Sequence, residues 1–155
     1  NLIDQYQTLE RLIISPNGVI EAVVAVLKKV TEAGVSIDPH IKNFVEKEGG
    51  LAYVDLSPPL TEGYVAARLS IALEADEYQI LSKNFSYFRP ESLPYHFAGD
   101  FLDIDPGAEA VFPELHAVLS NQKLIRGVDL SSFTSKAKRI RELENLRLRK
   151  GIFMI

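Results

Sequence analysis

A segment near the end of the chain, Phe133–Arg149, contains neither Gly nor Pro and carries an apolar stripe at helical spacing. The stripe starts at Phe133, and Ala137, Ile140, Glu144 and Leu148 fall within about 60° of its direction on a helix of 100° per residue, with Glu144 as its polar member. Ser131 or Ser132 can cap this helix. The sequence therefore predicts an amphipathic C-terminal helix, and the rest of the chain must supply an apolar surface for its stripe.

The same segment is strongly basic in an acidic chain. Residues 131–155 include seven basic side chains, namely Lys136, Lys138, Arg139, Arg141, Arg147, Arg149 and Lys150. Residues 1–120 hold 8 basic and 18 acidic residues, a net charge of −10, whereas residues 121–155 hold 9 and 3, a net charge of +6. Such a division of charge indicates an acidic protein partner, contact with the acidic body of the same chain, or binding to nucleic acid.

The distribution of the basic residues favours protein contact over nucleic acid. They lie all round the predicted helix, interrupted by Glu142 and Glu144, whereas a helix that binds DNA concentrates its cations toward the phosphates. The apolar residues Ile152, Phe153 and Ile155 follow and would be costly in water. Our first hypothesis is a non-enzymatic interaction or assembly subunit. Residues 131–155, which can form a projecting helix and tail, would contact acidic surfaces of this chain or of another chain, including a second copy. Nucleic-acid binding through residues 136–150 stays an alternative.

The first part of the chain predicts helices. Apolar residues recur at helical spacing over residues 2–14 and 19–33. Asp38-Pro39 predicts the start of a third helix, because Asp favours the N-cap and Pro the first helical position. Gly49-Gly50 predicts the end of that helix. Asp105-Pro106 repeats the start signal, and Pro113-Glu114 begins another short helical segment that continues to Leu119.

The middle of the chain predicts strands. Residues 51–56 form a short apolar run, and residues 64–75 alternate between apolar and polar side chains, which predicts a hairpin with residues 78–82. One long helix over the same window is the alternative, because Ala, Leu and Glu favour helices. Pro90 and Pro94 predict irregular structure over residues 84–101, and residues 124–130 predict a last strand. The fold class that results is α+β in a single domain, residues 1–155, with N-terminal helices and a small antiparallel sheet in the middle.

One acidic cluster offers metal ligands. Asp100, Asp103 and Asp105 lie close together in the sequence, and His96 precedes Asp100 by four residues. Such carboxylates can hold Mg²⁺ or Mn²⁺ in a phosphodiester hydrolase, which is our alternative function. The competing interpretation, which we favour, is that Asp105 caps a helix and that its neighbours are exposed. The three histidines, His40, His96 and His116, form no metal-binding motif.

Other classes of function lack support in the sequence. The chain has no cysteine, which excludes a thiol nucleophile and thiolate metal sites and slightly favours a cytoplasmic location. No apolar run approaches the roughly 18 residues of a membrane helix, so we expect a soluble protein without membrane contact. Neither a nucleophile elbow nor a phosphate-binding loop occurs. We therefore expect no cofactor and favour a protein that is not an enzyme.

Overall fold

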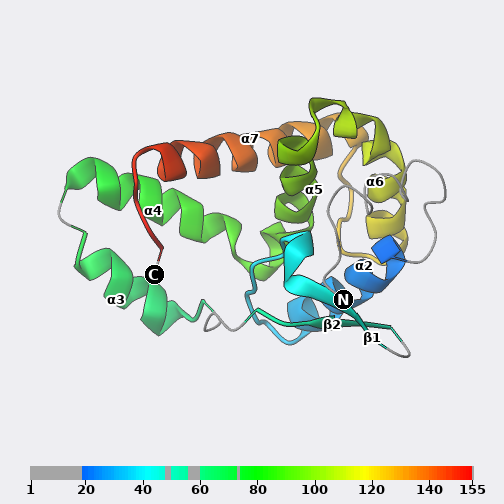
Figure 1. The fold of residues 1–155 in the computed structure, drawn as a ribbon, viewed down its shortest axis with the longest axis horizontal. Coiled ribbons are helices and arrows are strands. Elements are labelled where there is room, and N and C mark those ends of the chain that lie inside the picture. The colour runs from blue at the N-terminus through cyan, green and yellow to red at the C-terminus, as the bar shows by residue number, and fades with distance from the viewer. Residues whose placement is uncertain (1–18, 48–49, 56–59, 73, 155) are drawn as a thin grey trace.

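The computed structural model describes residues 19–47, 50–55, 60–72 and 74–154. The helix expected over residues 2–14 and the apolar residue Ile155 lie outside this part of the chain. The described residues are mostly helical and include a two-stranded antiparallel sheet, which is compatible with a helix-dominated α+β fold. Figure 1 shows α7 (Leu130–Arg149) running across one side of the molecule, with α5 and α6 near one end and α4 near the other.

The remaining elements are short. The helices are α2 (Val19–Glu32), α3 (Glu62–Ser70), α4 (Ala75–Tyr87), α5 (Leu93–Ile104) and α6 (Phe112–Asn121), the strands are β1 (Phe44–Lys47) and β2 (Gly50–Tyr53), and the 3₁₀ turns are η1 (Ile41–Asn43), η2 (Pro90–Ser92) and η3 (Pro106–Val111). The expected helices over residues 19–33 and 133–149 and the helical segment after Pro113 are confirmed. Asp105 also caps as expected, because its Oδ1 accepts a hydrogen bond of 2.7 Å from the Gly107 amide at the start of η3.

The prediction of a helix after Asp38-Pro39 is wrong. Asp38 accepts a hydrogen bond from the His40 amide, but the turn that follows is only the three-residue η1. The chain then enters β1, which pairs with β2 in a register that sets Phe44 opposite Tyr53 and Lys47 opposite Gly50. The rings of Phe44 and Tyr53 meet edge to face at 5.4 Å. Cross-strand aromatic packing stabilises the hairpin, and a strand thus replaces the expected helix.

The hairpin expected over residues 64–82 is also wrong, and two helices replace it. Thr61 caps α3 by accepting a hydrogen bond from the Tyr64 amide. The apolar residues that suggested alternation include Val65 and Leu69, which are four apart and share one face of α3. Both, and Ala72 just after the helix, pack against the cluster that includes Leu81 and Phe85 of α4. Helix propensity and this shared face therefore outweigh the alternating pattern.

Two further predictions are wrong: that Pro94 prevents a helix, and that residues 124–130 form a strand. Pro94 does not prevent a helix, since it occupies the first turn of α5, where no backbone N–H is required. The strand expected over residues 124–130 is absent from this described segment. Gly127 has a positive φ of 63°, and Asp129, not Ser131 or Ser132 as expected, caps α7 by accepting from the Ser132 amide at 2.8 Å. The chain turns here to begin the long helix.

The apolar side chains form two clusters. The larger one joins α2, η1, α5, α6 and α7, and it includes the first turns of the α7 stripe, Phe133, Ala137 and Ile140. The smaller one joins α3, α4 and the segment after α7 through Leu81, Phe85, Phe88 and Met154. α7, for which the sequence left a projecting arrangement open, packs against α4, α5 and α6. The helix therefore belongs to the larger cluster and contacts α4, which contributes to the smaller one.

Close packing of α5 on α7 depends on Gly99. A Cβ atom at this position would lie 2.9 Å from the Ala137 carbonyl oxygen, closer than van der Waals contact permits. We expect Gly99→Ala to lower the free energy of unfolding by about 1–3 kcal/mol, because a helix backbone must move. Gly63→Ala in α3 is the matched control, since nothing lies within 4 Å of its added Cβ. It should stabilise by up to about 1 kcal/mol through helix propensity, and urea denaturation of both variants tests the contrast.

Candidate functional site

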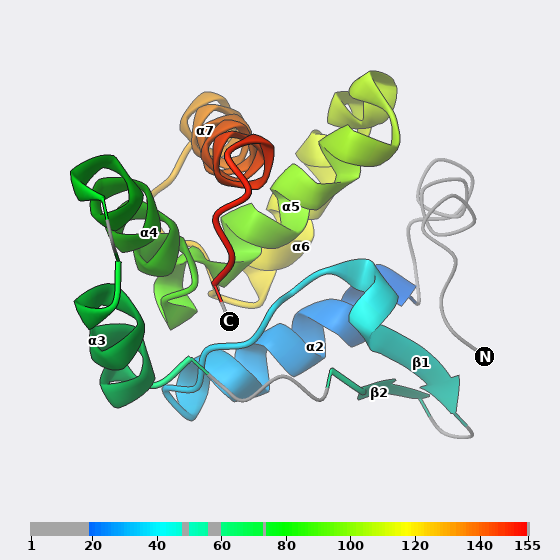
Figure 2. The same cartoon turned by 60° about the vertical axis from the view of Figure 1, so that its left-hand side comes forward.

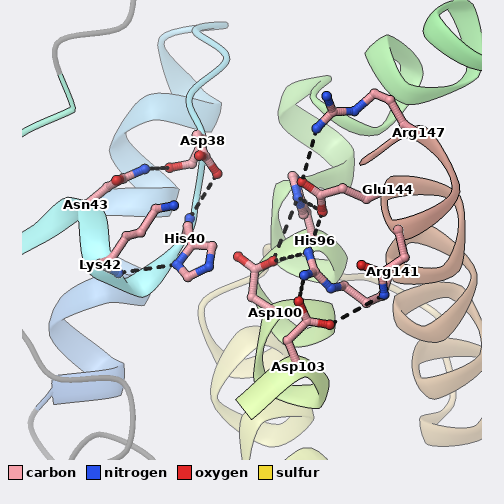
Figure 3. Close-up of polar contacts among 11 residues, drawn as sticks. Asp38, His40, Lys42, Asn43, His96, Asp100, Asp103, Arg141, Glu144 and Arg147 are labelled. Atoms are coloured by element: carbon pink, nitrogen blue, oxygen red, sulfur yellow. Dashed lines mark hydrogen bonds and ion pairs between the residues drawn. The ribbon is translucent and has the colours of Figure 1, made fainter. Parts of the chain in front are cut away.

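The strongest concentration of buried polar groups lies between α5 and α7 (Figure 3). His96 and Asp100 are one turn apart on α5 and only 2% and 3% exposed, respectively. They face Arg141 and Glu144 of α7, which are three residues apart and share a helix face. We call these four residues with Asp103 the α5–α7 polar cluster. It is an unusual use of a helix interface, since buried charges cost several kcal/mol each unless they are paired.

Arg141 connects the acids of the cluster. Its Nη1 atom donates to Glu144 Oε2 at 2.7 Å and to Asp100 Oδ1 at 3.3 Å, and its Nη2 atom pairs with Asp103 Oδ2. His96 Nε2 lies 3.0 Å from Glu144 Oε2 and 4.0 Å from Asp100 Oδ1. One guanidinium therefore contacts three carboxylates, and one of them, Glu144, also holds the imidazole.

These contacts shift the pKa values in opposite directions. Burial raises the pKa of Asp100 to about 7 and outweighs the nearby positive charges of His96 and Arg141. Burial also acts on Glu144, but its hydrogen bond with His96 and the charges of His96 and Arg141 lower its pKa to about 2. For His96, burial is opposed by the Glu144 hydrogen bond and the Asp100 charge, and its pKa lies above the ordinary value. Glu144 is thus the firmly ionised partner.

A third segment contributes Asp38. This residue precedes η1, and one of its ligand atoms lies within 4.8 Å of ligand atoms of both His96 and Asp100. Figure 3 shows the Asp38 and His40 segment facing the side of α5 that carries Asp100. Burial and then the Lys42 charge lower the pKa of His40 to about 4, so its ring is neutral at pH 7. The tertiary structure therefore adds a carboxylate from outside the predicted acidic cluster.

The predicted metal ligands are only partly brought together. His96 and Asp100 lie side by side, whereas Asp103 pairs with Arg141 and Asp105 caps η3. In the described ranges, neither Asp103 nor Asp105 belongs to a group of three metal-ligating side chains within 4.8 Å. Asp38 was missed because Asp38-Pro39 was interpreted as a helix cap. Its position 58 residues before His96 gives no local signal of the contact.

The basic residues of α7 mostly face groups of their own chain. Lys138 pairs with Glu109 at 2.6 Å, Lys150 with Asp76 at 2.7 Å, and Lys136 lies 3.8 Å above the centre of the Tyr95 ring. Arg141 is in the polar cluster. Arg147 is also buried, where it lies 3.8 Å from Glu144 and donates to the Ile152 carbonyl oxygen at 2.8 Å. Arg139 and Arg149 are exposed.

A second candidate site lies where the chain leaves α7. Residues 151–154 turn back from the end of α7 toward α3 (Figures 1 and 2). A groove of about 630 Å³ opens beside them; it is lined by Arg68, Ile71, Glu74, Asp76, Glu77, Lys150, Gly151, Ile152 and Phe153, and we call this the α3–tail groove. Phe153 is 69% exposed and Ile71 is 65% exposed. Ile71 was missed because the alternation over residues 64–75, which includes it, was interpreted as a half-buried strand.

The backbone of this segment is anchored. The Tyr64 hydroxyl donates to the Met154 carbonyl oxygen at 2.9 Å, and Arg68 donates to the Phe153 carbonyl oxygen at 2.7 Å through Nη2 and at 3.1 Å through Nε. Met154 is buried in the smaller apolar cluster, whereas Phe153 points away from it. The exposed ring is therefore presented from a fixed backbone.

Among the described residues, none of the helices combines the length and apolar character that crossing a membrane requires.

Comparisons with known proteins find no relative of this chain. No protein-family model, curated protein or solved structure matches the chain.

Proposed function

We propose that this protein is a non-enzymatic assembly subunit that associates with a second copy of itself through the α3–tail groove. The observation that carries the proposal is the presence of two large exposed apolar side chains, Phe153 and Ile71, on the lining of the same groove. A two-fold interface uses one surface twice, so a projecting group and a hollow must lie on the same patch. Phe153 supplies the projection and the groove supplies the hollow.

The charges around the groove favour a second copy over a highly charged partner. Arg68 pairs with Glu77 at 3.0 Å, and Lys150 pairs with Asp76 at 2.7 Å. The rim of the groove is therefore close to neutral, although the chain has a net charge of −4. Two acidic copies repel least where their own charges are already compensated. A nucleic acid or a strongly acidic protein would find few uncompensated cations here.

Substitution of Phe153 tests the interface directly. If the ring is the central contact, Phe153→Ala should weaken dimerisation of the full chain by at least about 30-fold, which corresponds to about 2 kcal/mol. Sedimentation velocity over a micromolar concentration series measures this change. Leu130→Ala removes an exposed apolar side chain at the other end of α7 and should leave dimerisation unchanged.

The dependence of dimerisation on ionic strength distinguishes an apolar interface from an ionic one. We expect the wild-type dimer to persist at high ionic strength, because burial of Phe153 and Ile71 is not screened. A wild-type chain that stays monomeric at all concentrations would contradict the proposal. Loss of the dimer in both Phe153→Ala and Leu130→Ala would also contradict it, because the groove would then have no special role.

A further inference from the structure

Three metal-ligating side chains from two separate segments converge, two of them buried and one, Asp38, half-buried. Asp38 lies before η1, and His96 and Asp100 are on α5, with one ligand atom from each within 4.8 Å of the others. The Asp38 segment is held by the hydrogen bond from the His40 amide at 3.2 Å and by Asn43 Nδ2, which donates to the Asp38 carbonyl oxygen at 3.2 Å. The convergence therefore depends on ordered backbone on both sides.

Two of these side chains carry buried atoms that lack a protein partner. Asp100 Oδ1 accepts from Arg141, but Asp100 Oδ2 has no hydrogen-bond partner. His96 Nε2 is held by Glu144, but His96 Nδ1 has no partner. A buried polar atom without a partner costs about 1–3 kcal/mol, and such atoms are rare in folded proteins. Each residue thus has one atom held by α7 and one buried atom without a protein partner.

The charge of the region indicates the sign of that ligand. The carboxylates of Asp38, Asp100, Asp103 and Glu144 oppose two guanidinium groups, Arg141 and Arg147. When all four acids are ionised, the region carries one excess negative charge with His96 protonated and two with His96 neutral, the form that binds a metal. A divalent cation would compensate both, and buried charges are tolerated when they are paired or coordinate a metal.

We propose that Asp38, His96 and Asp100 bind a divalent first-row transition-metal cation. One imidazole nitrogen and two carboxylate oxygens, without thiolate, suit ions such as Mn²⁺ or Zn²⁺. Glu144, hydrogen-bonded to His96, and Arg141, hydrogen-bonded to Asp100, would orient these ligands, as hydrogen-bonded partners of metal ligands generally do. The cation would connect the segment before η1 to α5, and this role is independent of dimerisation.

Mn²⁺ binding to the full chain is the direct test. Titration calorimetry should show one Mn²⁺ per chain, and pulsed electron paramagnetic resonance should show coupling of the bound Mn²⁺ to an imidazole nitrogen. The melting temperature should rise with Mn²⁺ concentration, because the cation binds the folded state. Asp38→Asn should weaken binding by more than about 10-fold. Asp38 is only half-buried, so the variant is expected to fold, which circular dichroism confirms or denies.

The matched control is Asp105→Asn. Asp105 belongs to the acidic cluster in the sequence, but its side chain caps η3, and Asn caps nearly as well. Mn²⁺ affinity should therefore stay at the wild-type value. Three results would overturn the proposal: no binding by the wild type, equal binding by folded Asp38→Asn, or bound Mn²⁺ without nitrogen coupling. Absence of binding would mean that protons compensate the excess acids, and it would leave the dimer proposal unaffected.

Discussion

Replacing Arg141 with methionine should lower the free energy of unfolding by about 3–5 kcal/mol. Methionine keeps much of the aliphatic packing but removes the guanidinium that contacts Asp100, Asp103 and Glu144. Asp100 is 3% exposed and its pKa is already about 7, so without Arg141 it would either remain as an uncompensated buried carboxylate or have to take up a proton, and Glu144 and Asp103 would also lose their partner. Guanidinium chloride denaturation of the full chain at neutral pH measures the loss.

Two comparisons define the origin of the effect. Arg139→Met removes an exposed arginine from the same helix and should change stability by no more than about 0.5 kcal/mol. Asp100→Asn removes the buried charge, so adding Arg141→Met to it should cost less than Arg141→Met costs in the wild type. Equal costs in the two backgrounds would show that the ion pair with Asp100 does not stabilise the α5–α7 interface.

Replacing Phe133 with alanine should also destabilise by about 3–5 kcal/mol, because a fully buried aromatic side chain leaves a cavity. Phe133 is 0% exposed, and its ring contacts those of Tyr95, Phe112 and His116 at 5.5, 5.8 and 5.5 Å between centroids. These contacts join the first turns of α7 to α5 and α6. Thermal denaturation followed by circular dichroism measures the change.

The control for this substitution is Phe153→Ala, which removes the same side chain from a position that is 69% exposed. At protein concentrations low enough to keep the chain monomeric, it should change stability by no more than about 0.5 kcal/mol. A similar loss in both variants would mean that residues 151–154 are packed more closely than the exposed fraction of Phe153 indicates.

Helices with strong local signals were predictable from the sequence. Phe133, Ala137 and Ile140 of α7 recur at helical spacing and are all buried in the larger apolar cluster. Asp105 caps η3 as its position before Pro106 indicates. In these cases the backbone hydrogen bonds, the cap and the apolar face all lie within a few residues of one another, so local chemistry decides the structure.

Segments whose local signals conflict were not predictable. Val65 and Leu69 fit both an alternating strand and one face of a helix, and contact with α4 decides for the helix. Asp38-Pro39 resembles a helix start, but pairing of Phe44 with Tyr53 across the hairpin decides for a strand. Contacts of this kind bring together residues that are separated in the sequence, and no local window contains them.

The candidate sites divide in the same way. The sequence by itself determined that a basic amphipathic helix is present, because spacing along a helix requires only local geometry. It did not place His96 and Asp100 on one helix face, since residues 84–101 were expected to be irregular and the structure forms α5 there. Only the tertiary structure decided that Arg141 and Glu144 meet that face, that Asp38 approaches it from another segment, and that Phe153 stays exposed. These outcomes follow from which helices pack together, and packing depends on the shape and charge of the whole chain.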